Sequence, residues 1–341
     1  MRYCRRFLAI PVVVVPLVML SACGGPERQP PSGEPPQPRP PAKYQIIVID
    51  HPTVTSVQDR VRGFEEALAK YPEFRIVDKP TGEGQRVKAM TAMENMLQKY
   101  PDLDGVFAIN DDSALGAVQA VKQQGREEVV IVGYDATPEA RAAIVKGGPL
   151  KADVIQYPEI IGLLTARTVA KHLAGREVPA SVPIAVGILD QADLKKGATP
   201  KYPGEIEQVD LKAPGKRLGV TLLTREHQFY RDLEAALRQE AERLGMTVVF
   251  QSADMRVAKQ TDQVENFATR GFDAIVICPA DSDAIVGAVK TANKAGIPVF
   301  TADIRANAGK VVSHIASNNV QGGAKAAEYL VKAIAGNQDQ R

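Results

Sequence analysis

The stretch GVFAINDDSALGAVQAVKQQGREEVVIVG, residues 105–133, decides the fold class. An apolar run over 105–109 is followed by a helical pattern over 113–124 and by a second apolar run over 129–133. Short apolar runs that alternate with helical segments are typical of parallel strands joined by helices. This unit therefore predicts an α/β fold.

The same alternation extends in both directions along the chain. Further strand-like runs cover 45–49, 75–78, 152–155, 218–223, 246–250, 273–277, 298–302 and 311–316. Further helical patterns cover 57–70, 86–99, 137–146, 159–174, 228–244, 257–270, 282–295 and 319–335. One sheet of ordinary size cannot hold so many units, so we expect two doubly wound parallel-sheet lobes. Residues 188–216, rich in Lys, Pro and Gly, are interpreted as a connector.

Composition and missing motifs exclude several functions. The formal net charge of +2 argues against a nucleic-acid-binding protein, which usually carries a strong basic excess. The phosphate-loop, nucleophile-elbow, zinc-protease and CxxC patterns are absent, and nothing near the four histidines has metal-ligand spacing. His172 and His314 are interpreted as structural. We expect no catalytic residue, no metal and no cofactor.

The N-terminus carries an export signal. Three arginines among the first six residues precede an apolar stretch over 7–19, which is too short to span a membrane comfortably. We interpret 1–22 as a signal peptide. The run Leu20-Ser21-Ala22-Cys23 resembles the lipobox of bacterial lipoproteins, in which the cysteine is acylated; the alternative is a plain signal peptide with a chance cysteine. Residues 23–43 would then be the acylated Cys23 and a Pro-rich spacer.

Cysteine use agrees with this interpretation. Cys4 lies in the removed segment and Cys23 would carry lipid, so Cys278 alone remains and the mature chain has no intramolecular disulfide. Cys278 ends an apolar run and is expected to be a small buried residue.

Polar side chains follow several predicted strands at their carboxyl ends, where open parallel α/β sheets bind ligands. They are Asn110, Asp135, Gln156 and Asp303, and Arg60 lies in the helix after the first strand. Each could instead cap a helix, although Arg and Gln are not capping residues.

Carboxylates, amides and a guanidinium suit a sugar, whose adjacent hydroxyl groups both donate and accept hydrogen bonds. Phe229, Tyr230 and Tyr134 could pack on its C–H faces, or could be core residues. Because Asp135 and Asp303 would repel each other in a dry cleft, we expect Arg60 near at least one of them.

At these residues the sequence resembles the D-ribose-binding family of ABC-transporter substrate-binding proteins, which have the type I periplasmic binding protein fold. The resemblance is carried by VFAINDDSALGA (106–117), VGYDATPE (132–139), IQYPEIIG (155–162), CPADSDAIVGAV (278–289) and VVSHIASNNVQGG (311–323). The two halves stand in exchanged order relative to that family, which indicates a circular permutation; the alternative is a mis-assembled gene.

The resemblance implies a hinge that the chain crosses three times, near Ser317, Gln156 and 186–189. One lobe would comprise 44–156 plus 318–341, and the other 157–187 plus 217–317. Residues 188–216 would hold a hinge crossing and the permutation connector.

The resemblance also implies a set of sugar ligands. Asp303 and Ser317 match it, His227 stands where the family has Asn, and Tyr134 replaces a Phe. Three further positions depart from the family: Cys278 replaces a ligand Asn, Ile304 replaces an Arg, and 82–84 lacks an expected aromatic residue. Arg305 follows Ile304 and could replace the missing Arg. The identity of the sugar is therefore not determined by the resemblance. The implied ligand-binding residues are Arg60, Asn110, Tyr134, Asp135, Gln156, His227, Phe229, Tyr230, Asp303 and Ser317.

The function implied is that of a monomeric, membrane-anchored periplasmic lipoprotein that closes its hinge on a monosaccharide or related polyol. It would deliver this sugar to the membrane subunits of an ABC permease, without catalysis. The alternative is a sensing subunit that presents its closed form to a chemoreceptor or sensor kinase.

Replacing Cys23 with Ala should move the protein from the membrane fraction to the soluble fraction, because the substitution removes the acylated thiol. Fractionation of cells expressing each form tests this. Wild-type protein already soluble in a detergent-free extract would contradict the lipobox interpretation.

Overall fold

The computed structural model describes residues 43–197 and 201–338. The predicted signal peptide, Cys23 and the spacer up to residue 42 lie outside the described residues. Among the helices that are described, none has the length and apolar character that crossing a membrane requires.

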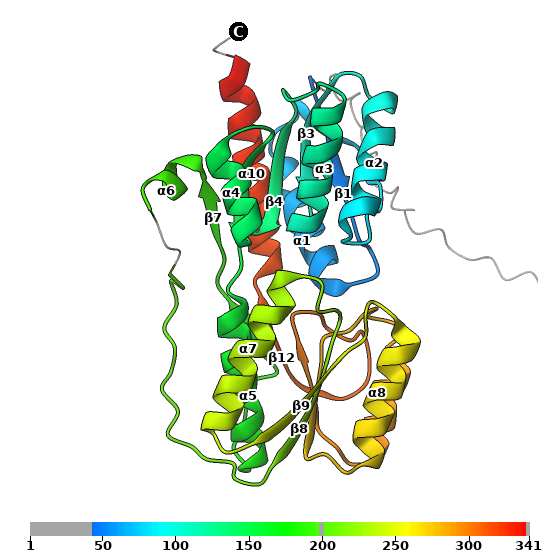
Figure 1. Cartoon of the computed structure of the whole chain (residues 1–341), viewed down its shortest axis with the longest axis vertical. Coiled ribbons are helices and arrows are strands. Elements are labelled where there is room, and N and C mark those ends of the chain that lie inside the picture. The colour runs from blue at the N-terminus through cyan, green and yellow to red at the C-terminus, as the bar shows by residue number, and fades with distance from the viewer. Residues whose placement is uncertain (1–42, 198–200, 339–341) are drawn as a thin grey trace, which may run out of the picture. The chain divides into compact units, whose positions relative to one another are not determined.

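One sheet has its strands in the order β2-β1-β3-β4-β5-β7. These strands are β1 (Tyr44–Ile49), β2 (Phe74–Asp78), β3 (Leu103–Ala108), β4 (Val130–Asp135), β5 (Leu150–Ile155) and β7 (Gly187–Asp190). The helices packed with it are α1 (Thr55–Leu68), α2 (Arg86–Lys99), α3 (Asp111–Gln123), α4 (Pro138–Lys146), α6 (Gln191–Lys195) and α10 (Asn319–Gln338). We call this assembly lobe 1 (Figure 1).

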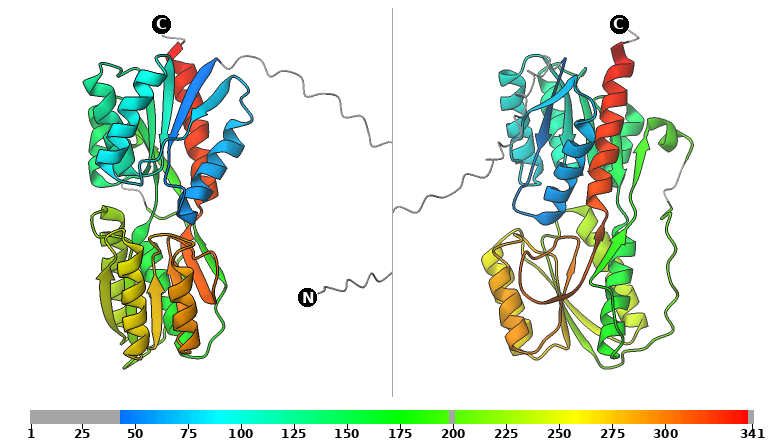
Figure 2. Two further views of the ribbon diagram at one scale, coloured as in Figure 1. Left: turned by 90° about the vertical axis from the view of Figure 1, so that its right-hand side faces the viewer. Right: turned by 180° about the vertical axis from the view of Figure 1, so that it is seen from behind.

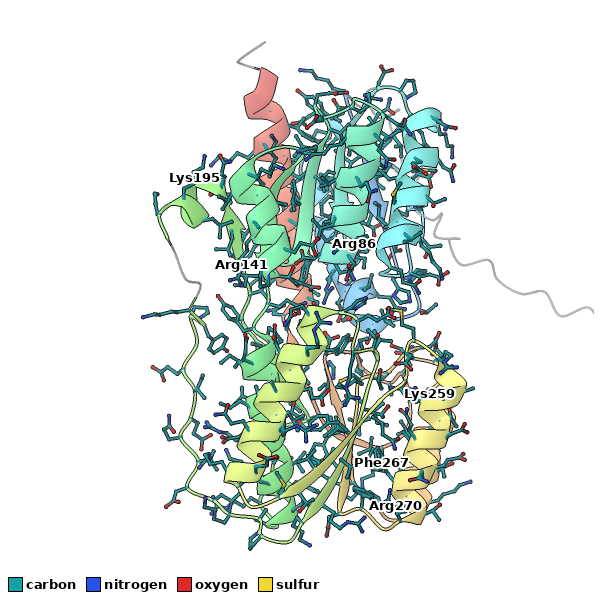
Figure 3. The ribbon with its side chains drawn as sticks, viewed as in Figure 1. Arg86, Arg141, Lys195, Lys259, Phe267 and Arg270 are labelled. Carbon is teal, nitrogen blue, oxygen red and sulfur yellow. The ribbon has the colours of Figure 1, made fainter. Side chains whose placement is uncertain are left out.

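The other sheet has the order β6-β12-β11-β10-β8-β9. Its strands are β6 (Ser181–Ile184), β8 (Arg217–Leu222), β9 (Thr247–Ser252), β10 (Ala274–Ile277), β11 (Val299–Ala302) and β12 (Val311–Ser317). With helices α5 (Pro158–Leu173), α7 (Gln228–Arg243), α8 (Val257–Thr269) and α9 (Val286–Lys294) it forms lobe 2. Phe267 of α8, labelled in Figure 3, is fully buried and its ring centroid lies 4.9 Å from that of Phe272.

The two-lobe α/β prediction is confirmed, and each predicted strand and helix is present. The sheets are parallel except at β7, which pairs antiparallel with β5. The chain returns to lobe 1 there from the end of the sheet where β5 leaves it, so β7 must run the opposite way. The sequence analysis missed β6, β7 and α6, because each has only four or five residues and too little periodicity to detect. Helix α9 begins at Val286 rather than at 282.

Helix α10, at the end of the chain, packs on the lobe that holds β1, as predicted (Figure 2). It lies so close to α1 that a Cβ at Gly63 would be 2.0 Å from the carbonyl oxygen of Val320. Its buried side chains are Ala326, Ala327, Leu330, Val331 and Ile334. Their spacing places them on one face of the helix, which packs on the lobe.

The described part of the connector lies against α5 and α7 (Figure 1). The Tyr157 hydroxyl donates to the Lys201 carbonyl at 3.1 Å, and Arg243 donates to the carbonyl of Val209 at 3.4 Å. A buried ion pair beneath it joins the two helices, with Arg167 Nε 2.6 Å from Glu240 Oε1. Arg167 also donates to the connector carbonyl of Glu207.

Replacing Arg167 with Ala should lower the free energy of unfolding by about 3 kcal/mol, because it strips a buried carboxylate of one of its cations. The matched control is Lys171→Ala, which removes the exposed pair with Glu207 and should cost less than about 1 kcal/mol. Urea denaturation measures both. Equal losses in the two variants would contradict this account of the connector.

Candidate functional site

A single cavity of about 40 Å³ between the lobes brings most of the predicted site residues together. Lobe 1 contributes residues at the carboxyl ends of β3, β4 and β5, and lobe 2 contributes residues after β8 and β11. The predicted residues that line it are Arg60, Asn110, Asp135, Gln156, His227, Phe229, Tyr230 and Asp303.

Arg60 contributes a cation to the wall of this cavity. Its two terminal nitrogens lie 3.9 Å from Asp135 Oδ1 of lobe 1 and 3.9 Å from Asp303 Oδ1 of lobe 2. The expectation that Arg60 lies near at least one of the two carboxylates is confirmed, and it lies near both. Arg60 is only 4% exposed. It is held by donation to the Ile109 carbonyl at 2.7 Å and to Asn319 Oδ1 at 2.9 Å.

Asp303 is buried, the Asp135 side chain is 11% exposed, and each carboxyl group has a neutral hydrogen-bond donor. Burial raises the pKa of Asp303, while Arg60 and the Tyr230 hydroxyl act to lower it. Burial raises the pKa of Asp135 well above its usual range, and Arg60 again opposes the shift. The Tyr230 hydroxyl donates to Asp303 Oδ2 at 2.6 Å, and the Gln156 amide donates to Asp135 Oδ1 at 2.6 Å.

Two acceptor atoms at the cavity have no hydrogen-bond partner among the described residues. They are Asp303 Oδ1 and Gln156 Oε1. An unpartnered buried acceptor costs about 1–3 kcal/mol, and a donor on a ligand would remove that cost. Asp303 and Gln156 both line the cavity, so hydroxyl groups of a bound molecule are suitable donors for these two acceptors.

The backbone around the carboxylates is strained. Asp135 has φ 115° and Asp303 has φ 63°, both in the left-handed region that non-glycine residues avoid. Such residues cost about 1–3 kcal/mol each and cluster at ligand sites. Neither aspartate caps a helix, whereas Asn110 both caps α3 through Ser113 N and lines the cavity.

Tyr134 and Ser317 do not line the cavity. The Tyr134 ring is fully buried behind Arg60, 4.0 Å from its guanidinium carbon, and its hydroxyl donates to Asn319 at 3.1 Å. Ser317 lines a neighbouring pocket, together with Arg305. Of the positions that depart from the family, Cys278 is buried as expected, whereas Ile304 lines the cavity itself.

The sequence analysis missed other residues at this site. His51 and Ser56 line the cavity, and His51 follows β1 in the same way as Asn110 follows β3, so the strand-end rule could have found it. Asn319, which orients Arg60, gave no signal in the sequence. Outside the cavity lining, Arg86 (Figure 3) pairs with Asp112, whose carboxylate lies 3.8 Å from Nε2 of the lining residue His227.

A second carboxyl pair lies beneath the site. Asp153 of β5 is fully buried, and burial together with neighbouring Asp111 and Asp135 raises its pKa well above the usual range. Asp111 accepts from Thr137 N at 2.6 Å, and Asp153 accepts from Ala136 N at 3.3 Å. The pair therefore braces the turn that follows Asp135. Among the described residues, no group of three His, Cys, Asp or Glu could hold a metal ion.

The difference in free energy of unfolding between the Asp153→Asn variant and the wild type should favour the variant more at pH 8 than at pH 4. A carboxyl group whose pKa is raised by folding stabilises the protein at low pH, and this contribution is lost as the pH rises through the folded-state pKa. The gain is about 1.4 kcal/mol for each pH unit by which that pKa is raised. Denaturation of both forms at the two pH values measures it, with exposed Asp102→Asn as the control. The same difference from wild type at both pH values would contradict the assignment.

Comparisons with known proteins agree with the fold. The sequence profile of a family described as the periplasmic binding protein domain matches residues 33–177 and 218–340. The ribose import binding protein of Escherichia coli is 35% identical over 130 residues, which are 38% of this chain and 43% of that protein. Its Bacillus subtilis counterpart is 40% identical over 131 residues, 38% of this chain and 42% of that protein. The chain thus spans less than half the length of these curated relatives in either alignment.

Solved structures show the same fold over most of the chain. An ABC-transporter solute-binding protein from Bacillus halodurans, with bound myo-inositol, has a TM-score of 0.60 at 16% identity, and the match covers 86% of this chain and 90% of that one. One from Burkholderia graminis, in complex with D-arabinose, has a TM-score of 0.58 at 16% identity, with the same coverage. Because the family profile matches well over half of its residues, the chain belongs to the periplasmic binding protein family.

Proposed function

We propose that this protein binds a monosaccharide or related polyol between its lobes and delivers it to an ABC importer. The observation that carries the proposal is the buried Arg60, which lies 3.9 Å from a carboxylate of each lobe. Beside it, Asp303 and Gln156 each present an acceptor atom without a partner among the described residues. Adjacent sugar hydroxyls match this arrangement, because each can donate to a carboxylate or amide and accept from a guanidinium.

Binding would proceed by closure of the hinge. A cavity of about 40 Å³ holds only a few waters, so a sugar ring must enter while the lobes stand further apart. Closure forms direct contacts: Ser282 N donates to the Thr53 carbonyl at 3.0 Å, and Thr55 N donates to Ser282 Oγ at 3.0 Å. A ligand held by both lobes shifts the population toward this closed form.

The lobe boundaries implied by the sequence form part of the proposal. We propose lobes of 44–156 plus 318–341 and of 157–187 plus 217–317, in a circularly permuted order, with 188–216 as hinge crossing and connector. A permuted order would explain why the Escherichia coli and Bacillus subtilis ribose import binding proteins align along one stretch of about 130 residues. We also propose a monomeric lipoprotein, anchored outside the cytoplasm through Cys23, that docks on permease subunits and performs no reaction.

Replacing Asp303 with Ala should weaken sugar binding by about 100-fold or more while leaving the protein folded. The substitution removes a charged acceptor whose hydrogen bonds are worth about 1.5–3 kcal/mol each. The experiment is a thermal-shift screen of pentoses, hexoses and polyols, followed by titration calorimetry of the sugar that stabilises most. A sugar at 100 times its Kd should stabilise by about 2.7 kcal/mol.

The control is Glu66→Ala, which removes an exposed carboxylate from the same helix as Arg60. It should bind as the wild type does. A screen in which no sugar or polyol stabilises the wild type would overturn the proposed function, and so would undiminished binding by the Asp303 variant.

A further inference from the structure

One part of the cavity wall is apolar. Val54 and Val57 of lobe 1 and Ile304 of lobe 2 line it, and we call these three residues the apolar corner. They are 2%, 4% and 2% exposed, respectively. They lie together because their neighbours are bonded across the lobes: Thr55 Oγ1 accepts from Arg305 N at 2.8 Å and donates to the Arg305 carbonyl at 3.2 Å.

Four backbone N–H groups at or beside this corner are engaged within the protein. Ile304 N donates to the Ala302 carbonyl at 2.8 Å, and Val57 N donates to the Val54 carbonyl at 3.2 Å. The intervening Thr55 N and the following Arg305 N are bonded to Ser282 Oγ and Thr55 Oγ1. A ligand hydroxyl placed here would lose its water and find none of these N–H groups open to it.

Ile109, Leu223 and Phe229 also line the cavity, but its charged and unpartnered polar groups belong to other residues of the lining. Asp303 Oδ1 and Gln156 Oε1 lack partners among the described residues, and Arg60 stands between the two aspartates. Hydroxyl groups of a ligand are therefore drawn toward these polar groups. Transfer of an alkyl group from water to the apolar corner is favourable in free energy, because it removes apolar surface from water.

We propose that the preferred ligand is a deoxy sugar that places a terminal methyl group against Val54, Val57 and Ile304. This inference rests on the proposed function, since it specifies the class of sugar that the same cavity selects. It makes Ile304 a specificity-determining residue: its side chain excludes a hydroxymethyl group at that position and accepts a methyl group.

The test uses the full chain and pairs of sugars that differ only in the terminal hydroxyl: L-rhamnose with L-mannose, L-fucose with L-galactose, and D-fucose with D-galactose. Titration calorimetry should show that the deoxy member of the binding pair binds about tenfold more tightly or better, the factor expected for a buried hydroxyl left unpaired. Equal or tighter binding of the hydroxymethyl member overturns the inference. Tightest binding of a sugar without a methyl group, such as D-ribose, overturns it too while leaving the proposed function intact. Failure of every sugar and polyol removes both.

Two variants separate polarity from shape at the corner. Ile304→Thr supplies a hydroxyl partner and should lower the ratio of the two affinities several-fold, toward one. Ile304→Val keeps the corner apolar and should keep the ratio, with thermal melting confirming that both variants fold. A ratio that falls equally in both variants, or one that Ser56→Ala abolishes, overturns the inference, because the discrimination would then come from cavity size or from the neighbouring Ser56 hydroxyl.

Discussion

The desolvated guanidinium of Arg60 is the interaction on which the rest of the site depends. Two aspartates of different lobes stand 3.9 Å from it, and in a buried cleft they would repel each other without a cation. The protein meets the cost of burying Arg60 with a carbonyl, with Asn319 and with the face of the Tyr134 ring. Asn319 is the first residue of α10, so the last helix that the structure describes orients the Arg60 side chain of α1, the first such helix.

This arrangement links closure to recognition. Asp135 belongs to lobe 1 and Asp303 to lobe 2, so separating the lobes takes one anion away from the cation. In the closed form, Thr55 is hydrogen-bonded to Arg305 and Ser282, so these backbone and hydroxyl groups are not available to a ligand. Asp303 Oδ1 and Gln156 Oε1, in contrast, have no partner among the residues that the structure describes. The contacts that close the cavity therefore also determine which of its polar groups can bind a ligand.

The sequence was informative where strand ends and helix starts decide position. Asn110, Asp135, Gln156 and Asp303 could be placed together because the carboxyl ends of parallel strands meet at one edge. The alternation of side chains along a strand could have excluded Tyr134, because successive residues face opposite sides of the sheet and the next residue, Asp135, lines the cavity. Asn319 and the connector contacts could not be predicted, because they depend on packing between segments that are distant in sequence. Asp153 gave only a weak signal, a charged residue inside a buried strand.

The most direct test of the central account is a distance measurement between the lobes. Spin labels on cysteines replacing the surface residues Lys88 of α2 and Lys259 of α8 report the separation by pulsed electron resonance. The account predicts a distribution that is broad without sugar and that shifts to shorter distances when the stabilising sugar is added. The same shift should be absent when Asp303 is replaced with Ala. Identical distributions with and without sugar in the wild-type background would contradict the account.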